Sequence, residues 1–231
     1  MYDIRMLVLA IDTALEACSA AIFDSEQGIV IASDSQIMMR GHAEALMPLV
    51  AGVMEQSGTA FANLDRIVVT VGPGSFTGLR VGIAAARGLG LAAKKPVIGI
   101  TTLSALAAPY IATDPATPVA AAIDGRHRHI YLQLYGTGGQ VLLSPRIVPV
   151  ADAVHAAAGA SARLVGSGAA MMADIWPDNQ KPPQIDERRA PDIDWVARLG
   201  AVAVQQDAPP KPLYLRPPDA HPQTSAKLPR R

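Results

Sequence analysis

Apolar residues in the first part of the chain follow a strand period, then a helical period, then a strand period again. Short apolar runs stand at residues 6–11, 18–23 and 28–33, with only a few residues between them. Links this short favour antiparallel neighbours. Apolar residues then recur at helical spacing over 41–58, and a β-branched run at 67–71 is typical of a buried strand. The pattern predicts three antiparallel strands, a helix and a fourth strand.

Helices and strands continue to alternate after a Gly-Pro-Gly break at residues 72–74. The pattern predicts a long helix over 76–93, a strand over 97–100 and a helix over 102–111. Strands separated by helices are usually parallel, with right-handed crossovers. A mixed sheet with an antiparallel hairpin at one side matches the ribonuclease H-like core of actin-like proteins.

A smaller version of the same three-strand opening follows a proline-containing linker at residues 112–118. Strand-like runs at 119–124, 129–135 and 141–147 precede a helix near 151–158. We therefore predict an α/β chain with a two-lobed, actin-like (ribonuclease H-like) fold, in which helices flank mixed sheets.

The predicted domain boundaries follow from this repetition. Residues 1–111 plus 190–206, the latter containing a terminal helix, form the N-terminal ribonuclease H-like lobe. Residues 112–189 form the smaller second α/β lobe. Residues 207–231 form a proline-rich C-terminal tail.

Composition narrows the partners and the location. Lys+Arg and Asp+Glu both total 20, so the formal net charge is zero. A basic footprint is the usual requirement for gripping nucleic acid, and its absence argues against tight tRNA binding by this chain alone. The single cysteine, Cys18, excludes an internal disulfide. With no apolar stretch of membrane-spanning length, we expect a cytoplasmic protein that does not enter a membrane.

An acid ends the first strand of each predicted half. It is Asp12, followed by Thr13, in the first half and Asp124 in the second. Facing one another across a two-lobed cleft, they would suit a metal–phosphate site. The alternative is that both acids cap turns at strand ends.

Glycines follow the fourth predicted strand, at Gly72 and Gly74, and could expose backbone amides to an anion. The alternative, which the spacing favours, is a tight strand-to-helix turn with Ser75 as the helix N-cap. The loop lacks the lysine of a Walker motif. A Gly-Ser-Gly segment at residues 166–168 is a weaker candidate for contact with an adenosine.

The helix predicted over 76–93 carries Gly78, Gly82, Ala86 and Gly90 at four-residue intervals. Glycine inside a helix costs about 0.5–1 kcal/mol relative to alanine, so the repetition needs an offsetting reason. Close approach of another element along this ridge is the simplest one. Periodicity alone leaves open whether that element belongs to the same lobe or to a partner.

Several segments of the chain, between about residues 6 and 216, resemble the bacterial TsaB family. They are Ile11–Thr13 with Cys18–Ile22, the block GPGSFTGLRVGIAAARGLGLA from Gly72, the segment VIGITTLS from Val97, Asp124–Arg126 with Tyr131, and Pro212–Arg216. The resemblance implies a non-catalytic pseudo-enzyme that binds and supports a TsaD-type paralogue. That paralogue transfers a threonylcarbamoyl group to the adenosine next to the tRNA anticodon.

The resemblance also implies the partners. They are the TsaD-type paralogue in a heterodimer and a TsaE-type ATPase in a larger complex, with tRNA contacted only through that complex and a homodimer as the other association. We expect no required cofactor. Weak ATP or ADP binding is predicted at the strand-end acids and the glycine loop, which are Asp12, Thr13, Gly72, Gly74 and Asp124.

Metal ligands are lacking from the sequence pattern. No two of the five histidines stand at the i, i+4 spacing of a helical metal site. The catalytic relatives carry a His-x-x-x-His metal pair whose positions fall on Thr102 and Leu106. Leucine has no donor atom and threonine is a poor ligand, so we expect no metal and no catalysis.

The resemblance places the association surface on the helix near 42–57 and on the glycine-ridge helix. The predicted partner-surface residues are Met39, His42, Leu46, Met47, Val50, Phe76, Thr77, Gly78, Arg80, Val81, Gly82, Ala86 and Arg87. Two other hypotheses remain, an actin-like ATPase or small-molecule kinase that uses Asp12 and Asp124, and a metallo-hydrolase. The second is the weaker, because the metal pair is absent.

Overall fold

The first lobe is built on a five-stranded mixed sheet. The computed structural model describes residues 6–205 and 207–216, and the predicted tail beyond 216 lies outside them. Its sheet runs in the order β3-β2-β1-β4-β5. The strands are β1 (Leu7–Asp12), β2 (Ala17–Asp24), β3 (Ile29–Ile37), β4 (Arg66–Gly72) and β5 (Val97–Thr101). The first three are antiparallel, whereas β4 and β5 pair in parallel, as the short and long connections predict.

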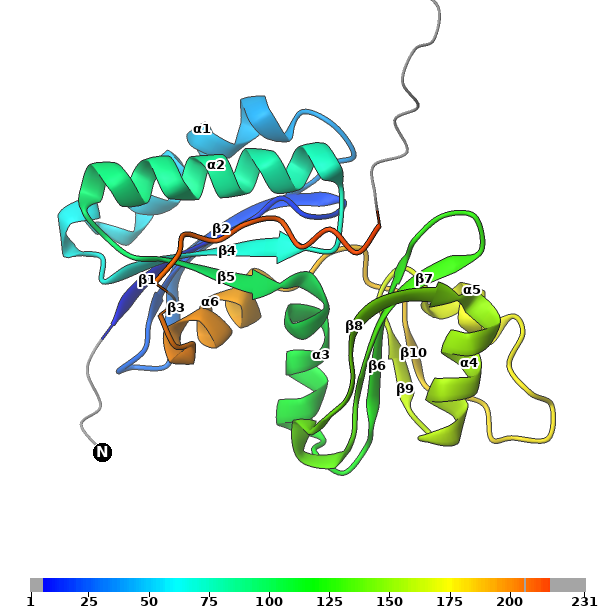
Figure 1. Ribbon diagram of the computed structural model, residues 1–231. Coiled ribbons are helices and arrows are strands. Elements are labelled where there is room, and N and C mark those ends of the chain that lie inside the picture. Colours follow the sequence, from blue (N-terminus) through cyan, green and yellow to red (C-terminus); the bar gives the residue numbers. More distant parts are fainter. Residues whose placement is uncertain (1–5, 206, 217–231) are drawn as a thin grey trace, which may run out of the picture.

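Helices cover both faces of this sheet (Figure 1). On one face lie α1 (His42–Ser57) and α2 (Phe76–Ala93), with the short 3-10 helix η1 (Phe61–Asn63) before β4. On the other face lies α6 (Ile193–Val202), the terminal helix predicted within residues 190–206. The predicted span of α2 is confirmed, because Ser75 caps its N-terminus and Lys94 ends it in a left-handed conformation.

The second lobe repeats the strand order of the first. Its sheet runs β8-β7-β6-β9-β10, with an antiparallel meander followed by two parallel strands. The strands are β6 (Val119–Asp124), β7 (His129–Tyr135), β8 (Val141–Pro149), β9 (Arg163–Val165) and β10 (Ile185–Asp186). The repeated order confirms the two-lobed α/β fold with mixed sheets, each with the strand order of a ribonuclease H-like lobe.

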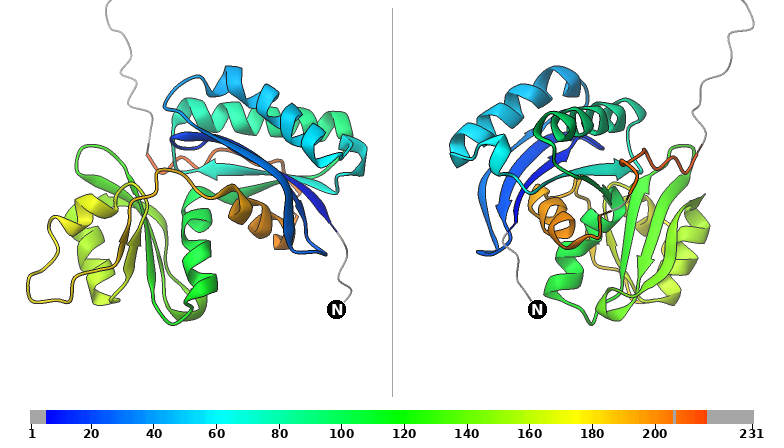
Figure 2. Two further views of the ribbon diagram at one scale, coloured as in Figure 1. Left: turned by 180° about the vertical axis from the view of Figure 1, so that it is seen from behind. Right: turned by 60° about the vertical axis from the view of Figure 1, so that its left-hand side comes forward.

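Helices α4 (Val150–Gly159) and α5 (Ala169–Ala173) cover one face of the second sheet, and α3 (Thr102–Thr113) covers the other (Figure 2). The connection between β7 and β8 contains the 3-10 helix η2 (Thr137–Gly139). The sequence pattern missed α5 and β10, because elements of five and two residues are too short to show a period. None of the described helices is long and apolar enough to cross a lipid bilayer.

Helix α3, which the predicted boundary at residue 111 assigns to the first lobe, contacts both lobes. Leu103, Leu106 and Ala107 pack with strands of the second sheet, whereas Ala105 joins the core beneath α6. The chain therefore packs α3 between the two lobes, forms the second lobe, and returns to the first lobe through α6. Periodicity identifies the apolar positions of such a helix but not the sheet that they face.

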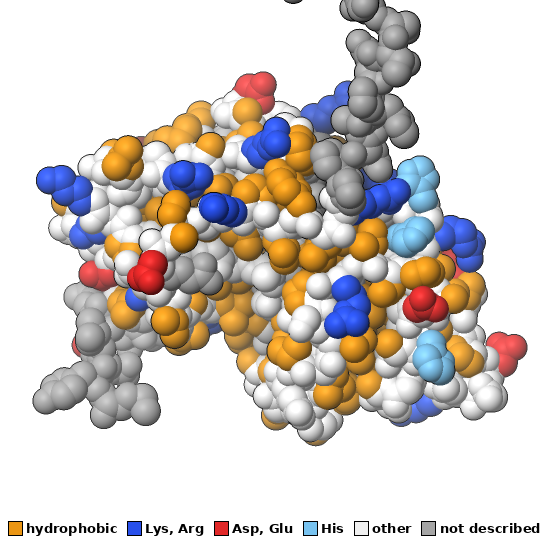
Figure 3. Space-filling model, in the orientation of Figure 1, with side chains coloured by type: hydrophobic (Ala, Val, Ile, Leu, Met, Phe, Trp, Pro, Cys, Tyr) orange, Lys and Arg blue, Asp and Glu red, His pale blue; other side chains and the backbone are white. Residues whose placement is uncertain are grey.

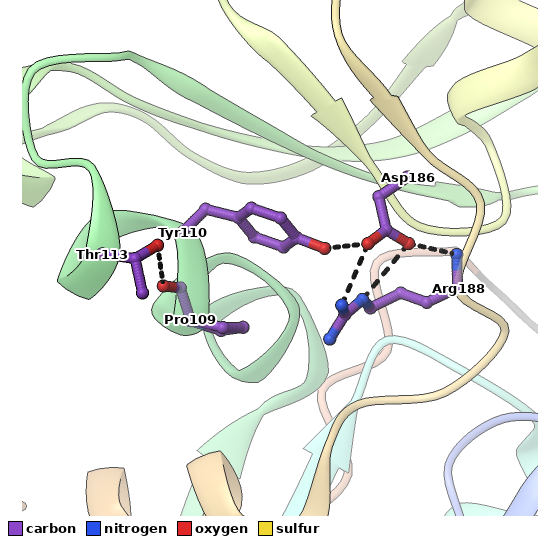
Figure 4. A network of polar contacts seen from close by, with 5 residues as sticks. All are labelled: Pro109, Tyr110, Thr113, Asp186 and Arg188. Carbon is purple, nitrogen blue, oxygen red and sulfur yellow. Dashed lines mark hydrogen bonds and ion pairs between the residues drawn. The ribbon is translucent and has the colours of Figure 1, made fainter.

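A polar network holds α3 to the edge of the second sheet (Figure 4). The hydroxyl of Tyr110 in α3 donates to Asp186 in β10, and Arg188 bonds the same carboxylate at 2.9 Å. The guanidinium carbons of Arg163 and Arg188 each lie 5.1 Å from the centre of the Tyr110 ring. Burial, with the Asp186 carboxylate beside it, raises the pKa of Tyr110 to about 12, so the phenol stays a hydrogen-bond donor.

Candidate functional site between the two lobes

The first predicted acid, Asp12, is sealed inside the first lobe. Its side chain is fully buried. Oδ1 accepts hydrogen bonds from the Thr70 hydroxyl at 2.5 Å and from the Ala14 amide at 3.0 Å, while Oδ2 has no partner among the described residues. Burial raises the pKa of this carboxyl, and these two hydrogen bonds oppose the shift only in part. The geometry is that of a structural acid, and it contradicts the prediction that Asp12 faces a metal or a phosphate.

The loop that would hold phosphate is occupied by the chain itself. The Ser75 amide donates to the Ala14 carbonyl at 2.7 Å, and the Ser75 hydroxyl accepts from the Gly78 amide at 3.2 Å. The neighbouring Thr13 is buried, and its hydroxyl donates to the Gly78 carbonyl at 2.7 Å. The N-cap interpretation of Ser75 is therefore confirmed, and Thr13 does not face the cavity between the lobes.

The glycine ridge of α2 faces inward, against the lobe's own β1–β2 connection. A Cβ atom on Gly78 would lie 2.1 Å from the Thr13 carbonyl oxygen, and one on Gly82 would lie 2.3 Å from its hydroxyl. A Cβ on Gly90 would meet the Val97 side chain at 2.4 Å. The small residues thus let α2 lie close to its own sheet, so the alternative in which this ridge meets a partner is wrong.

A cavity of about 590 Å³ lies between the lobes. Its first-lobe wall includes Ala14, Gly74 and Ser75, and its second-lobe wall includes Asp124 and Ser167. Asp124 is half-buried, unlike the equivalent acid of the first lobe, and its amide donates to the Ser167 hydroxyl at 3.2 Å. The Gly-Ser-Gly segment at 166–168 therefore reaches the cavity, through Ser167, beside the second acid. Its contact with an adenosine stays a prediction.

The two acids and the glycine loop do not form a shared site. Asp124 and Gly74 line the cavity, whereas Asp12 and Thr13 lie behind its wall and Gly72 is buried. A metal or nucleotide phosphates bridging both halves, as an actin-like active site requires, does not fit these residues. We therefore derive no reaction step through such a group.

The positions equivalent to the relatives' metal pair lie in the core. Thr102 and Leu106 are fully buried in α3. Within residues 6–205 and 207–216, no three His, Cys, Asp or Glu side chains gather closely enough to hold a metal ion. Burial also raises the pKa of the Cys18 thiol to about 11, which keeps it protonated and unreactive at neutral pH.

A C-terminal strap, residues 207–216, crosses from the first lobe to the second (Figure 1). The Leu213 amide donates to the Val71 carbonyl at 2.7 Å. The Tyr214 ring stacks on Phe76, with 5.3 Å between the ring centres. Arg216 then donates to the carbonyl of Gly125 in the second lobe at 3.2 Å. The sequence placed these residues in a proline-rich tail, although the aliphatic and aromatic residues of the segment PLYLR were a signal that it packs.

Six of the predicted partner-surface residues lie inside their own lobe. They are His42, Leu46, Val50, Gly78, Gly82 and Ala86. Leu46, Val50 and Ala86 belong to the core beneath α1 and α2, and the His42 ring lies 3.1 Å from the Leu15 carbonyl. Buried side chains cannot offer a surface, so the prediction is wrong for these six. It stays a prediction for the seven that reach solvent, which are Met39, Met47, Phe76, Thr77, Arg80, Val81 and Arg87.

Comparisons with known proteins place this architecture among tRNA-modifying proteins. A family model described as "TsaD: tRNA N6-adenosine threonylcarbamoyltransferase" matches residues 27–186. The "tRNA threonylcarbamoyladenosine biosynthesis protein TsaB" of Escherichia coli is 36% identical over 152 residues, which cover 62% of this chain and 64% of that protein, slightly less than two thirds of its length.

Two further proteins match over nearly the whole chain. An uncharacterized protein of Mycobacterium tuberculosis is 34% identical over 218 residues, covering 93% of this chain and 94% of that protein. The solved structure "YeaZ from Pseudomonas aeruginosa" superimposes with a TM-score of 0.75 at 28% identity, over 91% of this chain and 100% of that one.

Proposed function

Since the chain belongs to the TsaD family of tRNA N6-adenosine threonylcarbamoyltransferases and is a TsaB-type member of it, we propose that it supports, rather than performs, threonylcarbamoyl transfer to tRNA. Its role in tRNA threonylcarbamoyladenosine biosynthesis rests on the relatives' names. The finer proposal is that it binds a TsaD-type paralogue, with a TsaE-type ATPase joining the larger complex.

The observation that carries the non-catalytic proposal lies in the first lobe. There the protein's own atoms occupy the hydrogen-bonding positions that a phosphate would need. Asp12 is fully buried, and the Ser75 amide, which would otherwise be free for an anion, donates to Ala14. Catalysis in an actin-like cleft needs charged groups that face the cavity from both lobes. In this chain Asp12 does not face the cavity. The first-lobe acid that lines it, Glu16, pairs with Arg189 at 3.1 Å, and Asp124 lines it from the second lobe.

The outer face of α1 and α2 is the surface that fits a helical partner. Gly52 and Gly88 lie inside the two helices, and a Cβ on either would have no neighbour within 4 Å. Because glycine destabilises a helix by about 0.5–1 kcal/mol relative to alanine, and nothing within the chain requires it here, the reason lies outside the chain. Exposed Met47 and Ala84 on the same helices add apolar contact.

A substitution at Gly88 tests this surface without unfolding the chain. We expect Gly88→Leu to abolish a complex with the TsaD-type paralogue in size-exclusion chromatography with light scattering, because the side chain fills the space that a partner helix needs. The free variant is expected to be at least as stable as wild type, since leucine is the better helix former.

The matched control places the same side chain on another exposed helical position, Ala151→Leu in α4 of the second lobe. It is expected to leave assembly intact. A Gly88→Leu protein that assembles as wild type does would remove this surface from the proposal.

Weak ATP or ADP binding in the cavity, without a metal that bridges the lobes, remains part of the proposal, because Arg126, Arg189 and Arg216 line the cavity. We expect the isolated chain to show no ATP turnover. Turnover that disappears in Asp124→Asn would overturn the non-catalytic proposal and favour an actin-like ATPase.

A further inference from the structure

The turn between β6 and β7 holds three consecutive residues in the left-handed region. Arg126, His127 and Arg128 have φ values of 64°, 50° and 57°. Residues other than glycine rarely adopt this conformation, and a run of three is unfavourable for L-amino acids. We call these three residues the cationic turn.

The backbone of the cationic turn is fixed from both ends. The Arg126 amide donates to Oδ1 of Asp124 at 2.8 Å, and the Val150 amide donates to the Arg128 carbonyl at 3.0 Å. These bonds use main-chain atoms of the turn, so glycine would satisfy them equally well and without strain. The fold therefore explains the turn's shape but not its residue types.

The side chains of the cationic turn point away from the protein's own contacts. The Arg126 side chain is 77% exposed, and its ion pair with Asp124 is long, at 3.8 Å. His127 and Arg128 are exposed, and among the described residues no ion pair is found for the Arg128 side chain. Strain that the fold does not require, in exposed residues of which Arg126 has a long ion pair and Arg128 has none among the described residues, points to an anionic partner outside the chain.

The surroundings of the turn continue this charge. The strap brings Arg216 to the carbonyl of Gly125, and the preceding Tyr214 accepts from Arg80 of α2. The stretch 66–113, which contains α2, includes five Lys or Arg and no Asp or Glu. Figure 3 shows Lys, Arg and His side chains on this face over both lobes, with few acids between them.

We propose that the cationic turn contacts the phosphate backbone of tRNA while the chain is in its complex, an inference that rests on the proposed function. Folded RNA is bound largely through its phosphates, by cations that need no base readout. A small set of such contacts agrees with the zero net charge, which predicts weak binding by the chain alone. The phosphate contacts then orient the complex on tRNA rather than supply its main affinity.

Arg128→Gly separates this role from a structural one. We expect its melting temperature to equal or exceed that of wild type, because glycine relieves the strain at φ 57°. In fluorescence anisotropy with a labelled tRNA transcript and the complex with the TsaD-type paralogue, we expect affinity to fall several-fold at low salt. The slope of log K against log salt should become less steep by about 1. Arg128→Lys, which keeps the charge, should keep the wild-type slope.

Lys181→Ala is the control, because it removes one exposed charge from the loop between α5 and β10. An unchanged slope in Arg128→Gly, as in this control, would overturn the proposal, as would a lowered melting temperature with assembly lost. The proposal would also be overturned if millimolar ATP displaced tRNA from the wild-type complex but not from the Arg128→Gly complex, since the ligand of the turn would then be a free nucleotide. Light scattering without RNA tests assembly separately. If the paralogue does not bind, anisotropy of the isolated chain at low salt still decides for the turn.

Discussion

The glycines of α2 have different surroundings along a single helix. Gly78 lies against the Thr13 carbonyl, where a Cβ would stand at 2.1 Å, whereas a Cβ on Gly88 would meet nothing within 4 Å. A contact with a backbone atom is hard to relieve, because the β1–β2 connection would have to move with it.

Gly78→Ala is therefore expected to lower the free energy of unfolding by about 3 kcal/mol, in the upper range for overpacking a core. Gly88→Ala, the matched control in the same helix, is expected to raise it by about 0.5–1 kcal/mol through helix propensity. Urea unfolding of both variants checks the pair. Equal effects would mean that the close approach of α2 to Thr13 is not what the glycine serves.

Burial of the Asp12 carboxyl makes the stability of the fold depend on pH. The folded-state pKa of this carboxyl is raised by burial above the ordinary value of 3.8. The folded protein therefore holds this proton more tightly than the unfolded chain does, and the acid opposes folding increasingly as pH rises from about 3.8 to the folded-state pKa. Asp12→Asn should flatten this decline, so that its stability at pH 7 equals or exceeds that of wild type. Urea unfolding from pH 4 to 8 measures it, and a variant much less stable than wild type at pH 7 would contradict the burial argument.

Among the elements, the strap shows how a segment without helix or strand is held. Its contacts are a main-chain bond from Leu213, the stacking of Tyr214 on Phe76, and the hydrogen bond from Arg80 to the Tyr214 hydroxyl at 3.2 Å. Each belongs to the first lobe, whereas Arg216 reaches the second. The strap therefore closes one side of the cavity between the lobes.

Tyr214→Ala should weaken this strap. We expect a loss of about 1 kcal/mol in the free energy of unfolding, from the stacked pair and its hydrogen bond. We also expect faster hydrogen exchange at the Leu213 amide, which donates to the Val71 carbonyl. Thermal unfolding and native-state hydrogen exchange measure the two effects. As a control, Gln205→Ala changes an exposed side chain just before the strap and should leave both unchanged. Wild-type exchange at Leu213 in Tyr214→Ala would show that the ring does not hold the strap.

In the whole molecule, helix α3 couples the two lobes, and α6 returns the chain from the second lobe to the first. The second lobe lies between α3 and α6 in the sequence, yet α6 packs on the first sheet and α3 contacts both cores. Neither sheet keeps all of its covering helices if the other lobe unfolds. Shared elements of this kind make unfolding cooperative.

The two tryptophans report this coupling, because Trp176 packs in the second lobe and Trp195 stands in α6 of the first. Trp176→Phe and Trp195→Phe each leave a single tryptophan. Within each variant, we expect the urea midpoint from tryptophan fluorescence to equal the midpoint from circular dichroism. Two separate midpoints within one variant would show that the lobes unfold independently.

Local patterns in the sequence were enough to predict most of the helices and strands and their repetition. Periods of 2 and 3.6 depend on neighbouring residues, so strands, the limits of α2 and the repeated three-strand opening could be predicted from local pattern. Likewise, the N-cap at Ser75 follows from chemistry within one turn. The resemblance to TsaB was also carried by contiguous segments that need no tertiary information.

The element that each helix face contacts could be seen only in the folded protein. Periodicity groups Gly78, Gly82 and Ala86 on one side of a helix, but whether that side faces its own sheet or a partner depends on residues distant in the sequence, here Thr13. The same holds for Asp12, whose burial is created by elements that follow it, and for the strap, whose partners lie 91 or more residues away. Long-range contacts have no local period, and so the chain revealed them only once folded.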